Sequence, residues 1–274
     1  MIDPNLPPHD WLRLYLERQT GNAGTERSDA AIDTRLRSTL ASTNTPDVDS
    51  LVRALRIGAV DEALQTRVVA ALLNNETSFF RDPHCFDGLR DHVLPELLRQ
   101  RLPSRRLNVW SAACSSGQEP YSLAMLLRDS FPAETAQLRV EIHATDASAP
   151  MIERVAAGRY TTLELARGVS DECRRRWFTP DQSQWQIDRS LRAMVKPRVV
   201  NLVESWPPLP QMDLVMLRNV MIYMKPEVRQ TLLKRIRKAM NPQGALVLGG
   251  PESLLESDFF ERETHGRLRV YRPV

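Results

Sequence analysis

The first 72 residues carry apolar side chains in the spacing of short amphipathic helices. Their apolar positions form four groups that are separated by polar or glycine-containing stretches, at 11–16, 32–40, 51–57 and 60–73. The first group ends at Gly21, a residue typical of helix ends, and Asp49 or Ser50 is the expected cap of the third helix. This pattern predicts a small all-helical N-terminal domain over residues 1–72.

From residue 73 onward, short apolar runs alternate with helical patterns. The runs that predict strands lie at 107–110, 138–144, 212–217, 245–248 and 268–271. Helical patterns separate most of these runs, at 86–101, 121–130, 151–157 and 226–240. The last helix is expected to stop at Asn241-Pro242-Gln243-Gly244. The alternation is typical of a nucleotide-binding α/β domain, which we expect to span residues 73–274.

Residues 161–200 interrupt this alternation. Short strand-like runs at 185–187 and 194–200 are joined by polar turns, and Pro197 suggests an edge strand because proline cannot donate a backbone hydrogen bond. We predict a small inserted β-element at about 177–200. Residues 165–200 hold eight basic and four acidic side chains, a local net charge of +4. A solvent-exposed segment at the protein surface accounts for this charge better than a specific anion site does.

The stretch from Leu107 to Met125 has the form of a strand, a turn of small residues and a helix. Gly117 allows a tight turn, and Pro120 fits the first turn of the helix, where its missing N–H group has no partner to lose. The turn lacks GxGxxG and GKS/T, the patterns that cradle a pyrophosphate, and Glu119 would repel phosphate. These features favour a nucleoside ligand without phosphate groups.

Polar side chains end the predicted strands at the sheet edge where such domains bind ligands. Asp146 ends the second strand, where a carboxylate can accept hydrogen bonds from both ribose hydroxyls, although it could instead cap the next helix. Asn201, Arg218 and Asn219 occupy the ends of later segments. With Glu119, these groups suit a ligand that has hydroxyls and positive charge. S-adenosylmethionine has a ribose diol, a sulfonium and an ammonium group.

Composition limits the remaining function classes. The formal net charge of +3 is too small for the concentrated basic stripe expected of a nucleic-acid-binding protein. No apolar run reaches the roughly 18–20 residues that span a bilayer, and the N-terminus lacks the pattern of a secretory signal. Three scattered cysteines form neither a disulfide framework nor a metal motif. We therefore expect a cytoplasmic protein without a metal site, direct membrane insertion or a nucleic-acid partner.

Residues 74–82 (NNETSFFRD) lie between the helical region and the α/β region. By composition alone they are a linker with a capping box, in which Asn75 or Thr77 caps a short turn and the pair Phe79-Phe80 packs into the core.

Six motifs follow one another along the chain: NNETSFFRD (74–82), WSAACSSGQEPYSLAM (110–125), ATDAS (144–148), NL (201–202), LRNVMIYM (217–224) and GALVLGGPESL (244–254). Together they resemble the motifs of the chemotaxis receptor methyltransferases, the CheR family, over residues 72–274. The resemblance implies a Rossmann-like S-adenosylmethionine-dependent methyltransferase domain with a small inserted β-subdomain, preceded by the helical domain. It also implies methyl transfer to glutamate side chains on the cytoplasmic signalling helices of chemoreceptors (methyl-accepting chemotaxis proteins). The products would be S-adenosylhomocysteine and the glutamyl methyl esters that serve sensory adaptation.

The resemblance also assigns residues. It places the cofactor contacts at Asn75, Thr77, Arg81, Glu119, Asp146, Asn201, Leu202, Arg218 and Asn219. It places Arg81 and Tyr223 nearest the transferred methyl group, and we take these two as catalytic. A sulfonium is an activated donor and a glutamate is ionised at neutral pH, with a pKa of about 4.3. The reaction therefore needs orientation and exclusion of water rather than a metal or a strong base.

Three features depart from the family pattern. The helical region usually presents a basic face to the receptor, yet residues 1–73 hold eight arginines against ten acidic residues; Arg35, Arg37, Arg53 and Arg56 could still form a local basic patch. Gly249-Gly250-Pro251-Glu252 replaces the common GHSE. In part of the family the insert docks a receptor's C-terminal pentapeptide, and the few residues between Phe178 and Val199 argue against such docking here.

Two alternative functions share this cofactor. One is a methyltransferase of the same fold with another acceptor, such as a nucleic acid or a small carboxylic acid. The other is a non-catalytic signalling protein that binds S-adenosylmethionine or S-adenosylhomocysteine. The weak net charge argues against the nucleic acid, and the presence of Arg81, Asp146 and Tyr223 argues against the non-catalytic protein.

Overall fold

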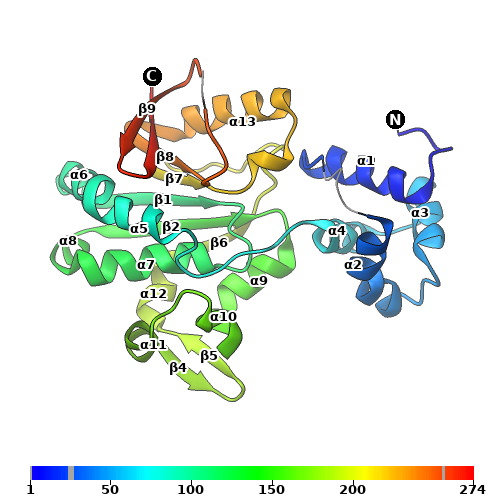
Figure 1. Ribbon diagram of the computed structural model, residues 1–274, viewed down its shortest axis with the longest axis horizontal. Coiled ribbons are helices and arrows are strands. Elements are labelled where there is room, and N and C mark those ends of the chain that lie inside the picture. The colour runs from blue at the N-terminus through cyan, green and yellow to red at the C-terminus, as the bar shows by residue number, and fades with distance from the viewer. Residues whose placement is uncertain (1, 24–27, 255–256) are drawn as a thin grey trace.

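The computed structural model describes residues 2–23, 28–254 and 257–274. Its N-terminal part is a group of four helices beside a larger α/β body (Figure 1). The helices are α1 (Pro8–Thr20), α2 (Asp29–Ser42), α3 (Val48–Arg56) and α4 (Glu62–Leu72). They enclose a core of their own, to which Leu12, Leu36, Val52 and Val68 contribute fully buried side chains. Part of the polar loop expected between α1 and α2 lies outside the described residues.

Local capping explains where these helices begin and end. Gly21 ends α1 in the left-handed conformation, with φ of 71°, as the sequence predicted. The prediction that Asp49 or Ser50 caps the third helix is wrong, because α3 begins earlier. Its cap is Asp47, whose carboxylate accepts a hydrogen bond from the N–H group of Ser50 at 2.7 Å.

A seven-stranded sheet organises the α/β body in the order β6-β2-β1-β7-β8-β10-β9. Its strands are β1 (Arg106–Ala112), β2 (Arg139–Asp146), β6 (Val195–Val199), β7 (Met212–Leu217), β8 (Met240–Leu248), β9 (Phe260–His265) and β10 (Leu268–Pro273). The five strands from β6 to β8 are parallel, and β10 and β9 continue the sheet in antiparallel pairs. This arrangement confirms the predicted Rossmann-like α/β fold.

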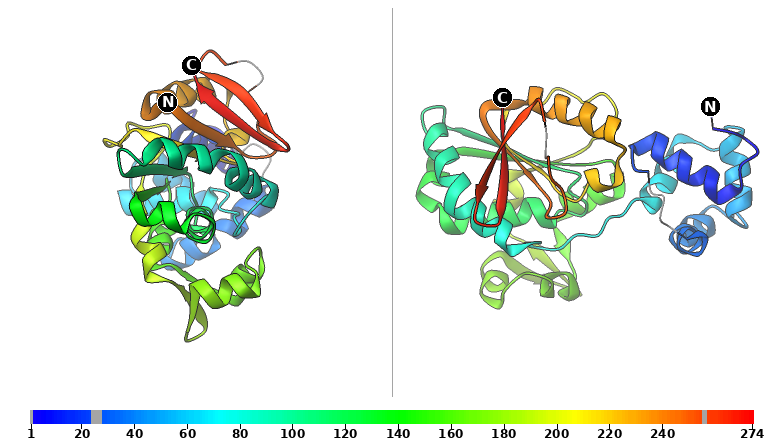
Figure 2. Two further views of the ribbon diagram at one scale, coloured as in Figure 1. Left: turned by 90° about the vertical axis from the view of Figure 1, so that its left-hand side faces the viewer. Right: turned by 45° about the horizontal axis from the view of Figure 1, so that its top comes forward.

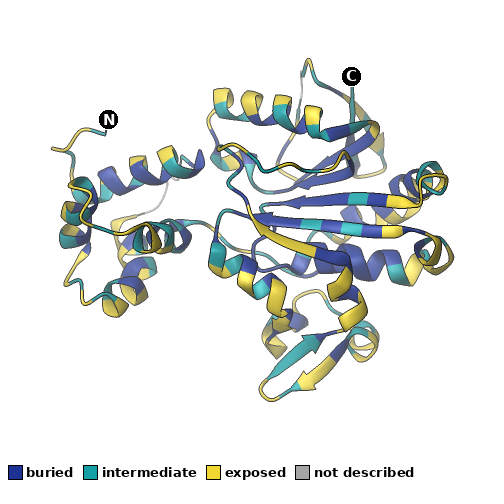
Figure 3. Ribbon diagram, turned by 180° about the vertical axis from the view of Figure 1, so that it is seen from behind, coloured by how far each residue is buried: buried dark blue, intermediate teal, exposed yellow. Residues whose placement is uncertain are grey.

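The helices cover both faces of this sheet. Their bounds are α5 (Pro83–Gly88), α6 (Leu94–Arg101), α7 (Gln118–Ser130), α8 (Pro132–Gln137), α9 (Ala149–Ala157) and α13 (Pro226–Ala239). Side chains of β7 alternate between two cores, so that Leu214 and Met216 join α7 whereas Val215 and Leu217 join α13. The buried strands run between these layers, whose outer surfaces are exposed (Figure 3).

The helix predicted at 86–101 begins earlier and is not uniform. It starts at Pro83, and a π-helical turn over Leu89–Val93 separates α5 from α6. No helix within the described ranges is long and apolar enough to cross a membrane.

The inserted element differs from its prediction. A second sheet in the order β3-β5-β4 unites β3 (Arg159–Tyr160), β4 (Phe178–Asp181) and β5 (Gln184–Ile187). The helices α10 (Thr162–Ala166), α11 (Asp171–Trp177) and α12 (Arg189–Met194) accompany it below the main sheet (Figure 1). Residues 195–199, which the sequence assigned to the insert, form β6 and pair with β2 in the main sheet. Pro197 does lie on an edge strand, as expected.

Two strand segments near the C-terminus were not predicted. The helix α13 ends at Ala239, so it does stop before Asn241 as expected, but residues 241–244 then continue as the extended start of β8. The strand β9 was not predicted, because its sequence FERETH is mostly polar and it lies at the exposed edge of the sheet.

Candidate active site

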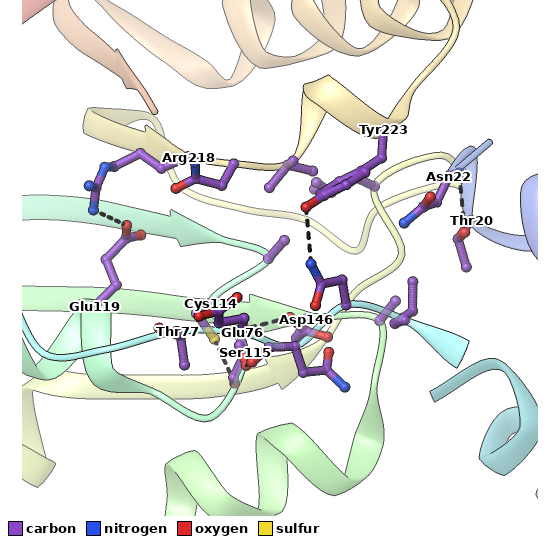
Figure 4. A pocket seen from close by; sticks show the side chains of 18 of the residues that line it. Thr20, Asn22, Glu76, Thr77, Cys114, Ser115, Glu119, Asp146, Arg218 and Tyr223 are labelled. Carbon is purple, nitrogen blue, oxygen red and sulfur yellow. Dashed lines mark hydrogen bonds and ion pairs between the residues drawn. The ribbon is translucent and has the colours of Figure 1, made fainter. Parts of the chain in front are cut away.

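A cavity of about 930 Å³ opens at the carboxyl edge of the parallel strands. All ten residues that the sequence singled out line it: Asn75, Thr77, Arg81, Glu119, Asp146, Asn201, Leu202, Arg218, Asn219 and Tyr223. Arg218 and Glu119 meet at one end of the cavity, and Thr20 and Asn22 lie at the other (Figure 4). The fold therefore gathers all ten residues around one ligand-sized space, although their individual roles remain predictions.

The turn between β1 and α7 forms the cavity floor in a strained conformation. Ala113 and Ser115 have positive φ values, of 56° and 51°, and Gly117 has φ of 97°. A Cβ atom at Gly117 would lie 2.8 Å from the hydroxyl of Tyr160, so only glycine fits there. This backbone turns the N–H group of Ser115 toward Asp146, from whose Oδ2 it lies 2.9 Å.

Asp146 is held by backbone groups at the end of β2. Its two carboxylate oxygens accept hydrogen bonds from the N–H groups of Ser115 and Ser148, each at 2.9 Å. The cap of α9 is Ser148, so the alternative that Asp146 is the helix cap is wrong. Burial raises the pKa of Asp146, and the two N–H groups oppose that shift. The carboxylate is fixed and keeps lone pairs for a ligand hydroxyl.

Residues 74–82 form a wall of the cavity instead of a free linker. They follow α4 as an extended thread along the α/β body (Figure 2, right). The carbonyl of Asn75 accepts a hydrogen bond from the Ser115 hydroxyl at 2.8 Å, and the N–H group of Phe80 donates to Ser122 Oγ at 2.9 Å. Phe79 is buried against Tyr160 in an edge-to-face contact. These contacts position the polar side chains of the thread over the cavity.

Arg218 links this thread to α7. Its guanidinium pairs with Glu119 Oε2 at 3.0 Å and with Asp82 Oδ2 at 2.7 Å, and it donates to the carbonyl of Arg81. The Arg218 side chain is 3% exposed. Ser111 donates a further hydrogen bond to Glu119 Oε1 at 2.7 Å. The charges of Arg218 and Glu119 are therefore already paired within the protein, which leaves Arg81 as the more accessible cation of the cavity.

Arg81 and Tyr223 reach the cavity from different segments. Nη1 of Arg81 donates to the carbonyl of Glu76 at 3.0 Å, and this bond holds the side chain beside the thread. Tyr223 ends the 3₁₀ turn Met221–Tyr223 that follows β7. Its hydroxyl accepts a hydrogen bond from Nδ2 of Asn74 at 3.0 Å (Figure 4). The sequence motif contained Asn74 but did not indicate this contact.

The helical domain contributes part of the cavity wall. Thr20 and Asn22 line the space, and the N–H group of Ala23 donates to the carbonyl of Tyr223 at 2.7 Å. Nδ2 of Asn201 donates to the carbonyl of Gln19 at 2.6 Å. Sequence reasoning missed Thr20 and Asn22, because these short polar residues belong to no motif and only the tertiary fold brings them to the site.

The cavity fits S-adenosylmethionine by the chemistry of its lining. Asp146 can accept hydrogen bonds from hydroxyl groups, and Glu76 adds an exposed carboxylate that is paired with Arg167 at 3.2 Å. Apolar side chains supply contact area for an adenine ring: Ala113, Cys114, Ala147, Val200, Leu202 and Met224. Asp82 and Glu119 pair with Arg218 and neutralise its charge, so this arginine is not free to bind a phosphate.

Comparison with known proteins agrees with this geometry. The family model described as "CheR methyltransferase, SAM binding domain" matches residues 75–267. The chain belongs to the CheR methyltransferase family. It is 37% identical to "Chemotaxis protein methyltransferase 1" of Pseudomonas aeruginosa, a match that covers 88% of each chain. Identity is also 37% with "Chemotaxis protein methyltransferase Cher2" of Pseudomonas putida, again over 88% of each chain.

More distant relatives agree with this assignment. "Chemotaxis protein methyltransferase" of Vibrio parahaemolyticus is 35% identical over 88% of this chain and 86% of its own. Among solved structures, the DhpI complex with S-adenosylhomocysteine overlaps with a TM-score of 0.34 at 16% identity, over 71% of this chain and 76% of that one. That overlap is too loose to bear on function. The family membership makes the chain an S-adenosylmethionine-dependent methyltransferase.

Proposed function

We propose that this methyltransferase esterifies glutamate side chains on the cytoplasmic signalling helices of chemoreceptors. The relatives are named chemotaxis methyltransferases, which supports a receptor as acceptor. The observation that carries the proposal is the way the cofactor cavity adjoins a second, open groove. The two hollows share the residues 73–76 as a common wall.

The groove has the position and lining to receive a helix of another protein. It lies between α2 and α4 on one side and the start of α9 on the other, where Pro150 and Met151 contribute. Arg35 of α2 and Arg67 of α4 line the groove, and their positive charges would attract an acidic helix. Of the four arginines expected to form a basic patch, Arg56 instead donates to the carbonyl of Leu6 and lies over the Trp11 ring.

In this proposal the residues of the chain act mainly by positioning the cofactor and the acceptor carboxylate. When bound, S-adenosylmethionine supplies the activated methyl group. Arg81 orients the ionised acceptor carboxylate, and Tyr223 steadies it by a hydrogen bond from its hydroxyl. Asp146 fixes the ribose, and the thread 74–82 closes the site against water. In-line positioning of this kind supplies roughly 7–11 kcal/mol of barrier reduction.

A labelling experiment tests the proposal. The full chain is incubated with tritiated S-adenosylmethionine and membranes that contain chemoreceptors from the same organism. We expect label on receptor glutamates that alkali releases as methanol, because methyl esters hydrolyse in base. Alkali-stable label, label on RNA or on a small acid, or binding without transfer would each contradict the proposal and favour an alternative acceptor or a non-catalytic role.

The same assay addresses the insert. Receptors that lack their C-terminal peptides should be methylated at the wild-type rate, because we expect the small sheet β3-β5-β4 not to dock a pentapeptide. A rate that falls with the peptide removed, together with binding of that peptide in a titration, would show that the insert is a docking site. The proposed place of action is the cytoplasm, where the receptor signalling helices lie.

A further inference from the structure

The carboxylate of Glu252 lies buried behind the cavity, between the ends of β7 and β8, and is 4% exposed. It accepts hydrogen bonds at 2.7–3.2 Å from five backbone N–H groups, those of Asn219, Val220, Met221, Ile222 and Gly249. One oxygen, Oε1, serves three successive residues of the turn, and Oε2 bridges Asn219 to Gly249. A single side chain thereby joins the ends of two neighbouring strands.

Four of these five bonds come from the segment that presents Asn219 and Tyr223 to the cavity, and the fifth comes from Gly249. The first N–H groups of a helical turn have no acceptor within the turn, so an outside acceptor must satisfy them. A carboxylate is favoured there because N–H groups give the start of a helix positive character. Asn219 also has φ of 59°, a left-handed conformation that costs energy outside glycine and needs surrounding bonds to persist.

We propose that Glu252 is a positioning residue for the methyltransferase reaction. It fixes the backbone of residues 219–222, and through that backbone it sets the places of the Asn219 amide and the Tyr223 ring. The effect on Tyr223 rests on the proposed function, whereas the effect on Asn219 concerns cofactor binding alone. The departure of Gly249-Gly250-Pro251-Glu252 from GHSE therefore keeps the acceptor on which the turn depends.

Gly249 offers a way to disturb this arrangement without removing its charge. A Cβ atom at Gly249 would lie 2.8 Å from Glu252 Oε2, 2.8 Å from the backbone nitrogen of Asn219 and 2.9 Å from its side-chain Nδ2. The φ of Gly249 is outside the left-handed region, so alanine causes no backbone strain there. The effect of Gly249→Ala would come from the steric clash of its methyl group with these neighbours. The next residue is a matched control, because a Cβ at Gly250 would meet nothing within 4 Å.

The experiment compares Glu252→Gln, Glu252→Asp, Gly249→Ala and Gly250→Ala in the full chain. We measure calorimetric affinity for S-adenosylhomocysteine and hydrogen exchange of the amides at 219–222, neither of which needs an acceptor. Glu252→Gln should weaken binding about tenfold and speed exchange, because its amide group turns a donor toward backbone donors. Gly249→Ala should do the same to a smaller extent, and Glu252→Asp should recover part of the loss. Gly250→Ala should match the wild type.

Measuring kcat then distinguishes a positioning role of Glu252 from a purely structural one. If a receptor is methylated, Glu252→Gln should lower kcat about 10- to 100-fold, as expected when a reacting geometry moves by about 1 Å. Tyr223→Phe should have a smaller effect in that background than in the wild type, because the ring is already displaced.

Several outcomes would overturn the inference. Wild-type affinity and exchange in both Glu252→Gln and Gly249→Ala would do so, as would equal losses in Gly249→Ala and Gly250→Ala. If Glu252→Gln does not fold, Glu252→Asp and the amide exchange of residues 220–222 in Gly249→Ala against Gly250→Ala decide, because the Cβ at Gly249 also crowds the Asn219 side chain and lowers affinity by that contact. Weakened binding in a protein that methylates no receptor would support the role of Glu252 at Asn219 and contradict only the proposed acceptor.

Discussion

Both ends of strand β7 carry a buried arginine–carboxylate cluster, but the two clusters serve different parts of the molecule. At the amino end, Asp213 Oδ1 lies 2.6 Å from Nε of Arg101 in α6, and Oδ2 accepts from the N–H group of Asn108 in β1. Asn241 of β8 donates to the same carboxylate at 2.6 Å. At the carboxyl end, Arg218 joins α7 to the thread 74–82 and lines the cavity.

The difference shows that a buried ion pair does not by itself mark an active site. The Asp213 cluster ties α6 to the strands β1, β7 and β8, and Asp213 is not among the residues that line the cavity. The Arg218 cluster is surrounded by residues with positive φ, among them Asp82, Ala113 and Asn219. The cavity and the strained loops around it, rather than pairing or burial, distinguish the carboxyl end of β7.

The largest expected effect comes from removing the arginine at each end. Arg218→Met leaves Glu119 and Asp82 without their cation, which typically costs about 3–5 kcal/mol when one partner of a buried pair is removed. Because the thread 74–82 then loses its anchor, we expect S-adenosylhomocysteine affinity to fall more than 100-fold as well. Urea unfolding measures the first effect, and calorimetry measures the second.

Arg101→Met is the matched variant at the amino end. It should lower the free energy of unfolding by a similar amount, because Asp213 is 2% exposed and would be left unpaired. Its affinity for S-adenosylhomocysteine at a temperature where it is fully folded should equal that of the wild type. If both variants weakened binding equally, the two ends of β7 would not be functionally distinct.

A second pair of variants should distinguish a cavity residue that binds the cofactor from one that supports turnover. Asp146→Ala removes the expected acceptor of the ribose hydroxyls and should weaken cofactor binding about 10- to 100-fold. Arg81→Ala should lower kcat strongly while cofactor binding changes less, because we expect Arg81 to orient the acceptor carboxylate. Steady-state methylation kinetics with calorimetric binding measure both. Asp171→Ala, at an exposed carboxylate on α11, controls for loss of charge alone.

The sequence predicted the central strands because their burial has a simple signature. The run 212–217 is apolar except for Asp213 and became β7, which is buried along its whole length. Residues 241–244 do follow the end of the helix as predicted, but they were not recognised as the start of β8, because proline and glycine are typical of turns. The side chain of Asn241 donates a hydrogen bond to the carboxylate of Asp213. A register irregularity between β7 and β8 accommodates the extended backbone of these residues.

The site residues that belong to sequence motifs could be predicted. Those that only tertiary packing brings to the cavity could not. Residues such as Asp146 and Arg218 follow strands whose order brings them to one edge, so their convergence follows from the α/β pattern and the resemblance. Glu252 was visible only as part of an altered motif, and its five bonds depend on the meeting of β7 and β8. Thr20 reaches the cavity because the N-terminal helices pack beside the α/β body, which no local pattern encodes.

The smallest predicted effect concerns the pH dependence of the amino-end cluster. Burial raises the pKa of Asp213, although the N–H group of Asn108 and the charge of Arg101 oppose it. An acid with a raised pKa binds its proton more readily when folded, so its contribution to stability improves as pH falls through the folded pKa toward the unfolded one. The unfolding free energy of the wild type minus that of Asp213→Asn should therefore rise between pH 7 and pH 4, by about 1.4 kcal/mol for each unit of pKa difference.

Glu141 on β2 supplies a control of opposite sign. Burial is the largest single influence and raises its pKa. The hydrogen bond from Arg139, with Nη2 at 2.7 Å, and the positive charges of Arg139 and its basic neighbours together outweigh burial and leave the pKa lowered. Its stabilising contribution is present above the unfolded pKa of about 4.5 and is lost as pH falls through the lowered folded pKa. The wild type minus Glu141→Gln should therefore stay level from pH 7 to about pH 5 and fall as the pH drops further. Urea titrations at each pH measure both differences. Parallel trends would mean that Arg101 outweighs burial at Asp213, and that the amino-end cluster stabilises the fold as an ion pair.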